Sequence, residues 1–245
     1  MATQNRKMVS YFLIPLYNES ANIQELHDNL TAVLPGVDKF FVLVDDCSTD
    51  DTIQQIHSYF KDTSYHVIEK PLNQGPGDSF NLGFEWILAN SLPGAELIVT
   101  IEGDNTSDLT TLPKMHAIAN LGFDLVLASV YAQGGKLEKT GLFRKIVSLG
   151  ANVVLRSVFN LRVATMSSFY RIYRISLVQT IKNNHSEIIR EKGFICMVEI
   201  LIKAIKSGAS VIEVPTNLLS HKRKGRSKMK ILRTFKEYLR FLIMK

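Results

Sequence analysis

The chain alternates short apolar stretches with segments whose apolar residues recur at helical spacing. The apolar stretches are bounded by Pro, Gly, Asn or Asp, which is typical of buried strands. They cover residues 8–14, 40–44, 65–68, 95–101 and 124–129, and Pro15 is expected to end the first. Between them, helices are predicted over residues 23–33, 52–60, 80–90 and 112–121. Because short strand–helix–strand connections place parallel strands side by side, we predict an α/β fold with a doubly wound, mostly parallel sheet.

The second half of the chain has a less regular pattern. Residues 133–139 predict a polar, glycine-containing loop, and residues 141–159 predict a long, largely apolar helix. Four polar residues recur at every fourth position of that helix and form either a solvated face or part of a site: Arg144, Ser148, Asn152 and Arg156. The last predicted elements are a strand over 167–174, a helix over 193–206 and a strand over 209–215.

Carboxylates follow several of the predicted strands. Glu102 and Asp104 come directly after one buried strand, and Asp45 and Asp46 come after another. Residues i and i+2 of an extended chain project to the same side, so Glu102 and Asp104 can face one point. Hard divalent cations bind such oxygen ligands, and parallel sheets bind ligands at the carboxyl ends of their strands. A single acidic turn could simply be solvated, but several at one sheet edge favour a binding site.

Composition and charge narrow the classes of protein. A chain of 245 residues with 46% hydrophobic residues suffices for one large α/β domain or two small ones. Two isolated cysteines, Cys47 and Cys196, and scattered histidines argue against a disulfide framework or a zinc site. We find no signal peptide and no apolar window of about 18 residues, so we expect a cytoplasmic protein without a membrane-spanning helix.

The net charge of +6 is concentrated at the C-terminal end. Residues 221–245 hold ten Lys and Arg and one Glu, whereas the remainder holds 19 basic and 22 acidic residues. This is not the pattern of a uniformly basic nucleic-acid binder, so we expect no nucleic-acid partner. Residues 228–244 predict an amphipathic, cationic helix that either packs on the domain or binds a membrane surface. An anionic surface is favoured, because each basic side chain there contributes on the order of 1 kcal/mol.

Seven short motifs, taken together and in this order, resemble family 2 glycosyltransferases of the GT-A fold. The closest resemblance is to the branch that includes dolichol-phosphate mannose synthase and acts on polyprenyl phosphates. The motifs lie at 14–19, 44–50, 73–77, 102–104, 168–171, 199 and 222–228. The resemblance implies a GT-A domain over 1–220, with a nucleotide-binding half at 1–130 and an acceptor half at 131–220. A basic, membrane-proximal tail follows at 221–245.

The resemblance also implies roles for individual residues. The residues implied in nucleotide binding are Pro15, Tyr17, Glu19, Asp45, Asp46, Gly75 and Gly77. Asp104, assisted by Glu102, is expected to coordinate Mg²⁺ or Mn²⁺ at the donor diphosphate. Phosphate groups of the donor or the lipid are expected to meet Arg171, Lys222, Ser227 and Lys228. Arg144 and Ser148 occupy the region that handles the acceptor phosphate, so the expected catalytic residues are Asp104, Arg144 and Arg171.

The nature of the acceptor follows from a missing base. A hydroxyl acceptor needs a general base, which many family 2 enzymes supply from a Glu-Asp pair, and this chain contains no Glu-Asp dipeptide. A phosphate monoester is already anionic. We therefore predict inverting transfer from a GDP- or UDP-linked sugar to a polyprenyl phosphate, by an enzyme peripherally bound to the cytoplasmic membrane face. Glu199 could still serve as a base, although a structural or clamping role is favoured for it.

The chain departs from the family pattern at four places. Glu102 stands where the family usually has Asp, and Thr106 stands where the polyprenol branch often has Gln. The strand end at residues 128–131 lacks its usual Arg, having Val130 instead, and Lys222 replaces an Arg of the basic motif. A Lys keeps the charge but loses the bidentate fork. These positions bear on the sugar, the nucleotide and the acceptor.

Other functions remain as alternatives. The same fold could transfer sugar to a saccharide or glycolipid, or bind a nucleotide sugar without turnover. A receiver-like signalling domain would need an Asp after the third strand, where the chain has Glu69, Lys70 and Pro71. A membrane-anchoring partner subunit and a homo-oligomer both stay open.

Overall fold

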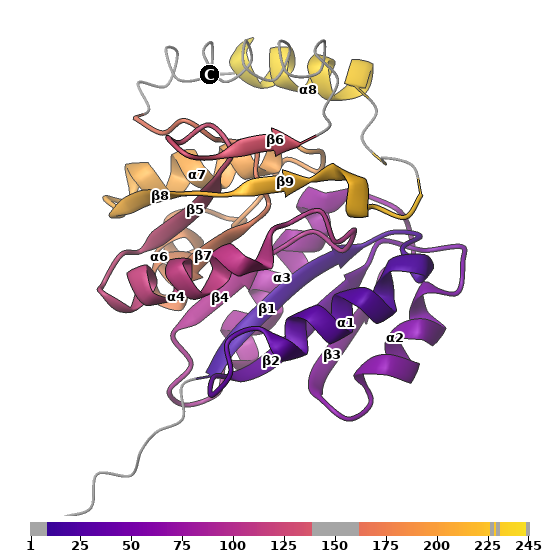
Figure 1. Cartoon of the computed structure of the whole chain (residues 1–245). Helices are drawn as coiled ribbons and strands as arrows, with labels where there is room; N and C mark the ends of the chain where they lie inside the picture. Colours follow the sequence, from indigo (N-terminus) through magenta and orange to yellow (C-terminus); the bar gives the residue numbers. More distant parts are fainter. Residues whose placement is uncertain (1–8, 139–161, 226–227, 229–230, 244–245) are drawn as a thin grey trace, which may run out of the picture.

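The computed structural model describes residues 9–138, 162–225, 228 and 231–243. Seven strands form one sheet in the order β3-β2-β1-β4-β7-β5-β8 (Figure 1). They are β1 (Val9–Leu16), β2 (Asp38–Asp45), β3 (Ser64–Glu69), β4 (Leu97–Thr100), β5 (Leu125–Ser129), β7 (Arg171–Arg174) and β8 (Val211–Pro215). Only β7 runs antiparallel to its neighbours, β4 and β5. The predicted α/β fold with a mostly parallel sheet is confirmed.

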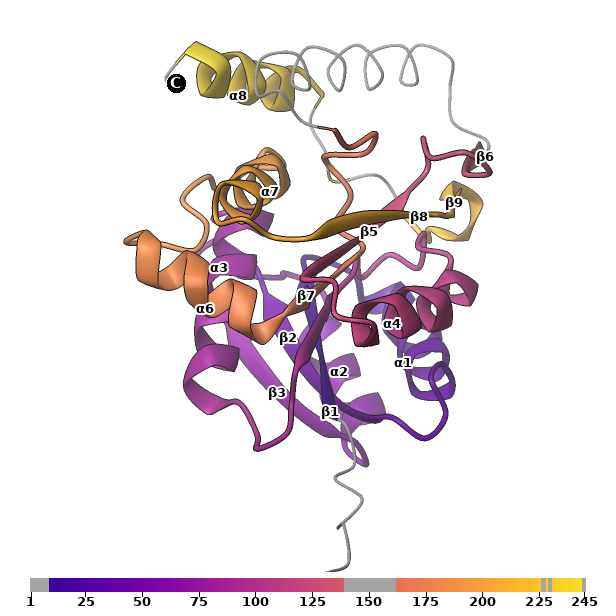
Figure 2. The same ribbon diagram turned by 90° about the vertical axis from the view of Figure 1, so that its left-hand side faces the viewer.

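Helices cover both faces of this sheet. They are α1 (Ile23–Ala32), α2 (Thr52–Phe60), α3 (Pro76–Asn90), α4 (Leu112–Asn120), α6 (Ile175–Asn184), α7 (Cys196–Lys206) and α8 (Ile231–Ile243), with short 3₁₀ turns at Ser20–Asn22, Leu109–Thr111 and Ser220–Lys222. Figure 2 shows α3 and α6 on one side of the strands and α1 and α4 on the other. Side chains alternate between the faces along each strand. Phe12 and Ile14 of β1 therefore pack with α1, α2 and α4, whereas Tyr11 and Leu13 pack with α3, α6 and α7.

Strand β1 continues through Pro15, so the prediction that Pro15 ends it is wrong. Pro15 pairs in register with Val44 of β2, but β4 pairs only with residues 10–13 of β1. At Pro15 the strand has lost its second neighbour, and a residue without an N–H is tolerated at such an edge position. The two additional residues of β1 place Leu16 and the residues after it at the carboxyl ends of the parallel strands.

Two features of the second half differ from the sequence pattern. The predicted loop at 133–139 contains strand β6 (Lys136–Glu138), which pairs in parallel with β9 (Asn217–Leu219) in a second, two-stranded sheet. Helix α6 is absent from the prediction, although its buried Leu177, Val178 and Ile181 recur at helical spacing. The β6–β9 pair joins segments far apart in the sequence, so a local pattern does not reveal it.

Helix α8 forms as predicted and lies across the top of the molecule (Figures 1 and 2). Its Tyr238, Phe241 and Leu242 pack against the core on the α3, α6 and α7 side, while Leu239 and Ile243 are 44% and 82% exposed. Part of the apolar face thus packs on the domain, which was the alternative interpretation. None of the described helices is long and apolar enough to cross a membrane.

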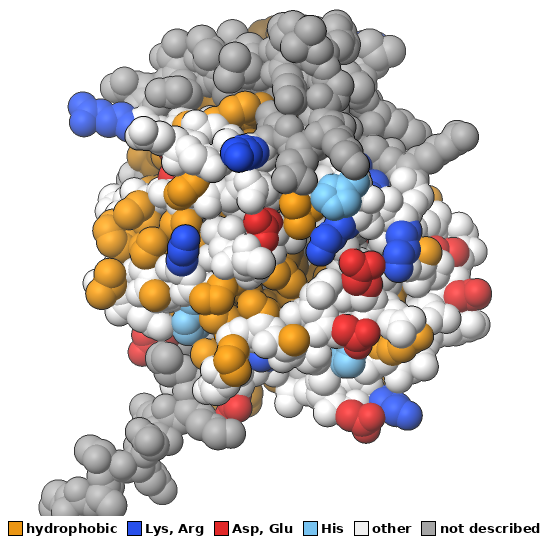
Figure 3. Space-filling view, in the orientation of Figure 1, with side chains coloured by type: hydrophobic (Ala, Val, Ile, Leu, Met, Phe, Trp, Pro, Cys, Tyr) orange, Lys and Arg blue, Asp and Glu red, His pale blue; other side chains and the backbone are white. Residues whose placement is uncertain are grey.

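Some of the predicted features lie outside the described residues. These are the helix at 141–159, with Arg144 and Ser148, and Ser227 of the basic motif. Figure 3 shows hydrophobic side chains gathered over α4 and β8, and charged side chains of both signs over α1 and α2. In the part of the chain that the structure describes, this face therefore carries no continuous basic surface.

Candidate active site

A pocket of about 660 Å³ lies at the carboxyl ends of β1, β2 and β4, where parallel sheets bind ligands. Eight of the residues singled out from the sequence line it: Pro15, Tyr17, Glu19, Asp46, Gly75, Glu102, Asp104 and Lys228. The ends of β1, β2 and β4 carry six of them, the start of α3 carries Gly75 and the C-terminal basic stretch carries Lys228. The structure thus brings these predicted residues together around one pocket at this edge of the sheet.

The turn after β4 holds both of its carboxylates in fixed positions. Asp104 Oδ1 accepts hydrogen bonds from the Thr106 N–H (3.1 Å) and hydroxyl (2.6 Å). Asp104 Oδ2 accepts from Arg223 Nε at 2.6 Å and pairs with a second guanidinium nitrogen at 2.5 Å. Glu102 accepts from the Ser107 hydroxyl at 2.6 Å. The i and i+2 carboxylates therefore face the same pocket, one of them already against a positive charge.

This donor set fits a divalent cation that arrives with a diphosphate. Burial raises the pKa of Glu102, and the nearby Asp104 charge raises it further, so an added cation would be favourable there. The described residues contain no cluster of three or more His, Cys, Asp or Glu side chains that could hold a metal. Glu102 and Asp104 would supply two oxygen ligands, and substrate phosphates and water would complete the shell.

The segment after β1 forms the opposite wall of the pocket. Glu19 accepts a hydrogen bond from the Asn22 amide at 2.5 Å. Burial raises the pKa of Glu19 to about 7, and the Asp104 charge adds to that effect. Near neutral pH this carboxyl is thus present in both protonation states. The protonated form can donate a hydrogen bond to a ligand, and the ionised form can accept one from it. Asn18 takes a left-handed backbone conformation, with φ of 52°.

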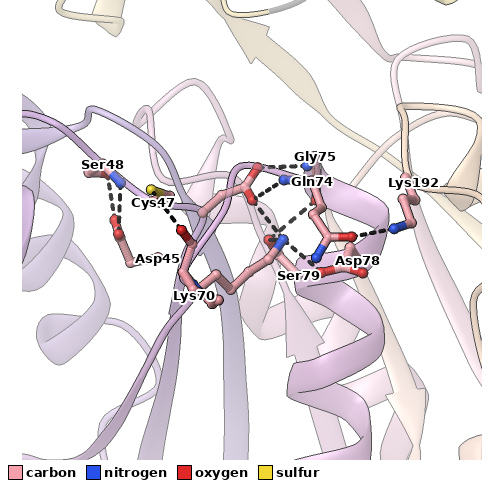
Figure 4. Close-up of polar contacts among 11 residues, drawn as sticks. Asp45, Cys47, Ser48, Lys70, Gln74, Gly75, Asp78, Ser79 and Lys192 are labelled. Carbon is pink, nitrogen blue, oxygen red and sulfur yellow. Dashed lines mark hydrogen bonds and ion pairs between the residues drawn. The ribbon is translucent and has the colours of Figure 1, made fainter.

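The loop at residues 73–77 is held by a buried lysine that the sequence did not single out (Figure 4). Lys70, which follows β3, is 5% exposed, and its ammonium group lies 2.6 Å from Asp46 and 2.8 Å from Asp78. Asp46 also accepts hydrogen bonds from the Gln74 and Gly75 N–H groups, each at 2.8 Å. Asp46 therefore shapes the wall of the pocket by fixing this loop to the end of β2.

The glycines of the same loop allow another chain segment to approach. Gly75 has φ of +93° and directly precedes α3, which starts at Pro76, four residues earlier than predicted. A Cβ on Gly75 would lie 2.6 Å from the Lys192 carbonyl oxygen, and one on Gly77 would overlap the Glu191 carbonyl. Gly75 lines the pocket, whereas Gly77 lies outside its lining and serves this close packing.

We expect Lys70→Met to weaken donor binding more than it slows the chemical step. The substitution leaves the buried Asp46 and the partly exposed Asp78 without their cation, and breaking a buried pair costs about 3–5 kcal/mol. Asp46, which anchors the loop at 73–77, is then held less firmly, and the KM for the nucleotide sugar is expected to rise about tenfold. Steady-state kinetics and urea unfolding measure the two effects. Lys61→Met, at an exposed position, is the matched control. An unchanged KM in a destabilised protein would contradict the positioning role.

The basic segment, defined as residues 222–228, contacts the segment after β1. Lys228 donates to the Asn18 carbonyl oxygen at 2.9 Å, and its ammonium lies 6.0 Å from the centre of the Tyr17 ring. Lys224 lies 3.2 Å from Glu25 of α1. Of the described basic residues of this segment, Arg223 and Lys228 line the pocket beside its carboxylates.

Arg171 requires a correction, because it does not reach the pocket. Its side chain is fully buried, and its guanidinium donates to the carbonyl oxygens of Met166, Ser168 and Met197 and to the Tyr173 hydroxyl. All the described contacts are internal, so Arg171 joins β7 to the segments beside it. The expectation that it meets a phosphate is wrong in this structure.

Two further residues, Asp45 and Lys222, differ from expectation, whereas Glu199 agrees with it. Asp45 lies outside the pocket lining and accepts from the Ser48 N–H and hydroxyl at 2.8 and 2.5 Å, which fixes the turn after β2. Lys222 lines a smaller, separate cavity on the other side of the Glu102 turn. Glu199 accepts from the N–H groups of Arg190 and Glu191 and pairs with Lys203 at 2.7 Å. This geometry matches the structural role that was one of the two favoured for Glu199; its described charged partner is a lysine rather than an arginine.

Several pocket residues were missed by sequence reasoning. Arg223 lies inside the basic motif, but the comparison with the family directed attention to Lys222, its neighbour. Lys192 comes from the loop before α7 and donates to the Gln74 side chain. Thr234 and Glu237 bring α8 into the pocket lining. Only the charge of Arg223 was a usable signal, since the others depend on contacts between distant segments.

Solved structures with the same architecture identify the fold. Glucosyl-3-phosphoglycerate synthase from Mycobacterium tuberculosis superposes with a TM-score of 0.65 at 17% identity, over 97% of this chain and 78% of that one. That crystal structure contains Mn²⁺, UDP-glucose and glycerol 3-phosphate, and another contains Mg²⁺ and UDP. The fold is therefore the GT-A fold of nucleotide-sugar glycosyltransferases.

The chain belongs to glycosyl transferase family 2, whose sequence model matches residues 11–182. It is 27% identical to the undecaprenyl-phosphate mannosyltransferase of Micrococcus luteus, over 89% of this chain and 86% of that protein. It is 28% identical to the dolichol-phosphate mannosyltransferase of Pyrococcus furiosus, over 94% of this chain but only 61% of that protein. The protein is thus a glycosyltransferase that uses a nucleotide sugar, and the resemblance stated from its motifs is confirmed.

Proposed function

We propose that this glycosyltransferase moves a sugar from a GDP- or UDP-linked donor to a polyprenyl phosphate, with inversion and with Mg²⁺ or Mn²⁺. The observation that carries the proposal is the pocket composition: paired carboxylates at the end of β4 face the Tyr17 and Glu19 wall and the basic segment. A bound divalent cation supplies Lewis-acid stabilisation of the leaving diphosphate. Glu102 and Asp104 would hold it.

The chain's own residues are assigned roles around the donor. Tyr17 and Glu19 hold the base and ribose, and the loop fixed by Asp46 closes that side. Lys228 lines the pocket, and its described hydrogen bond goes to the Asn18 carbonyl oxygen, so it can meet a donor phosphate without leaving an ion pair. Phe169 and Phe194, stacked 5.6 Å apart, form an apolar part of the wall. Transfer then needs an acceptor placed in line with the anomeric carbon.

The lipid acceptor is supported by the relatives and by the exterior of α8. The curated relatives carry names of undecaprenyl-phosphate and dolichol-phosphate mannosyltransferases. Leu239 and Ile243 are exposed on α8, beside the exposed Lys236 and Arg240. Such a surface suits an anionic membrane interface. We propose that the enzyme binds the cytoplasmic membrane face through this helix.

A product assay tests the proposal. The purified chain is incubated with labelled GDP-mannose or UDP-glucose and undecaprenyl or dolichyl phosphate, with Mn²⁺, Mg²⁺ or EDTA. We expect label to enter the organic phase as a sugar-phosphate lipid with one of the two donors, and EDTA to abolish the transfer. Label found only in water-soluble glycosides, or transfer unaffected by EDTA, would contradict the proposal.

A saccharide or glycolipid acceptor is the second candidate, and Glu237 is the observation that favours it. This carboxylate lines the pocket from α8 and packs on the Gly193 main chain, where it could act as the general base that a hydroxyl acceptor needs. If the acceptor is a hydroxyl, Glu237→Gln should lower turnover strongly. If it is a phosphate, turnover should survive. Metal-dependent turnover with either acceptor would refute the alternative that the protein binds nucleotide sugars without transferring the sugar.

A further inference from the structure

Besides the contacts of Lys228 and of the Lys224 ammonium, two independent contacts connect the basic segment to the turn that carries Asp104. One is the backbone of Lys224, and the other is the Arg223 side chain. The side-chain amide of Asn22 makes two reciprocal hydrogen bonds with Lys224, accepting from its N–H at 3.2 Å and donating to its carbonyl oxygen at 3.1 Å. Asn22 is 1% exposed, and its own carbonyl oxygen accepts from the Asn105 amide at 3.0 Å. Asn22 thus fixes the main chain beside Arg223 to the turn that carries Asp104.

The Arg223 side chain is held by a different contact. Its guanidinium lies at 2.6 and 2.5 Å from a single oxygen of Asp104, while the other oxygen of Asp104 is bound by Thr106. Arg223 is partly exposed and lines the same pocket as Glu102 and Asp104. A change of its side-chain rotamer can therefore move the charge within the pocket without releasing the backbone from Asn22.

A guanidinium and a divalent cation compete for this oxygen. A carboxylate oxygen coordinates Mg²⁺ at roughly 2.0–2.1 Å, so the two positive charges would lie only a few ångströms apart. Like charges at such distances repel strongly in a partly buried site, where water screens them less than in solution. Asp104 Oδ2 therefore holds either the guanidinium or the metal ion.

We propose that Arg223 is a diphosphate-binding residue that rests on Asp104 as its counter-ion and is displaced when a divalent cation binds there. The released guanidinium then pairs with the donor's diphosphate, which lies within the same pocket and matches its planar fork. This inference rests on the metal and diphosphate of the proposed function. The inference explains why the pocket favours the metal ion together with the nucleotide. A metal ion alone breaks the Arg223–Asp104 ion pair, whereas a metal ion with a diphosphate gives Arg223 a new anionic partner. The two ligands should therefore bind cooperatively.

Titration of Mn²⁺ followed by the electron paramagnetic resonance signal of the free ion tests the proposal. The proteins are the wild type, Arg223→Gln, Lys224→Gln and Asp104→Asn. Arg223→Gln should bind Mn²⁺ alone several-fold more tightly than the wild type, because the competing cation is gone. In the presence of Mn²⁺, it should bind GDP or UDP several-fold more weakly. Lys224→Gln removes the same charge from the same segment but pairs with Glu25, so neither affinity should change.

Opposite signs for the two affinities distinguish the proposal from a merely structural role. If Arg223 only positions Asp104, its removal weakens both affinities. That result would overturn the inference. So would an unchanged Mn²⁺ affinity of Arg223→Gln, or an equal effect of Lys224→Gln. The inference would also fail if Arg223→Gln bound no more Mn²⁺ than Asp104→Asn. The Mn²⁺ titration needs neither sugar nor acceptor. Sugar transfer with an unchanged Mn²⁺ affinity would thus defeat this inference alone, and tighter Mn²⁺ binding without any transfer would defeat the proposed function alone.

Discussion

Asp104→Asn is expected to lower kcat/KM by about a thousandfold and to remove the metal dependence of nucleotide binding. A metal ion at the leaving diphosphate is worth several kcal/mol of transition-state stabilisation, and each 1.36 kcal/mol is about tenfold in rate. Asparagine keeps the shape of the side chain and the bonds to Thr106, but it lacks the charge that holds either Arg223 or a cation. The initial rate at which labelled sugar enters the organic phase measures the first effect. Calorimetric titration with GDP and UDP, with and without Mn²⁺, measures the second.

The charge change itself is controlled by Asp51→Asn. Asp51 is an exposed acid that directly precedes α2 and lies outside the pocket lining. The substitution Asp51→Asn should therefore leave kcat/KM unchanged. Should Asp104→Asn retain a tenth or more of the wild-type kcat/KM, Asp104 is not the principal metal ligand. The paired carboxylates of this turn would then have a structural role only.

Arg171→Met is expected to lower the free energy of unfolding by about 3–5 kcal/mol, a large share of the 5–15 kcal/mol typical of folded proteins. A buried ion pair can often be replaced by apolar residues at little cost. Here, however, the partners of Arg171 are main-chain carbonyls of Met166, Ser168 and Met197, which no substitution at 171 removes. These oxygens would stay buried without donors, at about 1–3 kcal/mol each before relaxation.

Urea unfolding of the wild type, Arg171→Lys and Arg171→Met measures the loss. Lysine keeps the charge and some of the donors, so its stability should fall between the other two, and it guards against a methionine variant that does not fold. Nucleotide affinity of the folded Arg171→Lys protein should equal that of the wild type. Wild-type stability combined with a lost affinity would restore the phosphate-binding role expected from the sequence.

The sequence determined the sheet and the position of the site. Apolar runs fix which residues become buried strands, since their side chains must leave water, and parallel strands bring their carboxyl ends to one edge. The sequence pattern therefore places Asp46, Glu102 and Asp104 at one edge of the sheet. The helices with strong periodicity, such as α2, were placed for the same reason, because burial of one face is a local property of the pattern.

Tertiary structure decided which partner each polar side chain meets. Arg171 and Arg223 are both arginines in motifs that suggested phosphate binding, yet the insertion of antiparallel β7 between β4 and β5 buries Arg171 in the core. Arg223, rather than Lys222, reaches Asp104 across 119 positions of sequence. Lys70 likewise acquires its role only when β3 and the start of α3 converge on Asp46. A hydrogen bond or an ion pair requires two groups within about 3 Å, and for segments this far apart only the packed fold determines that distance.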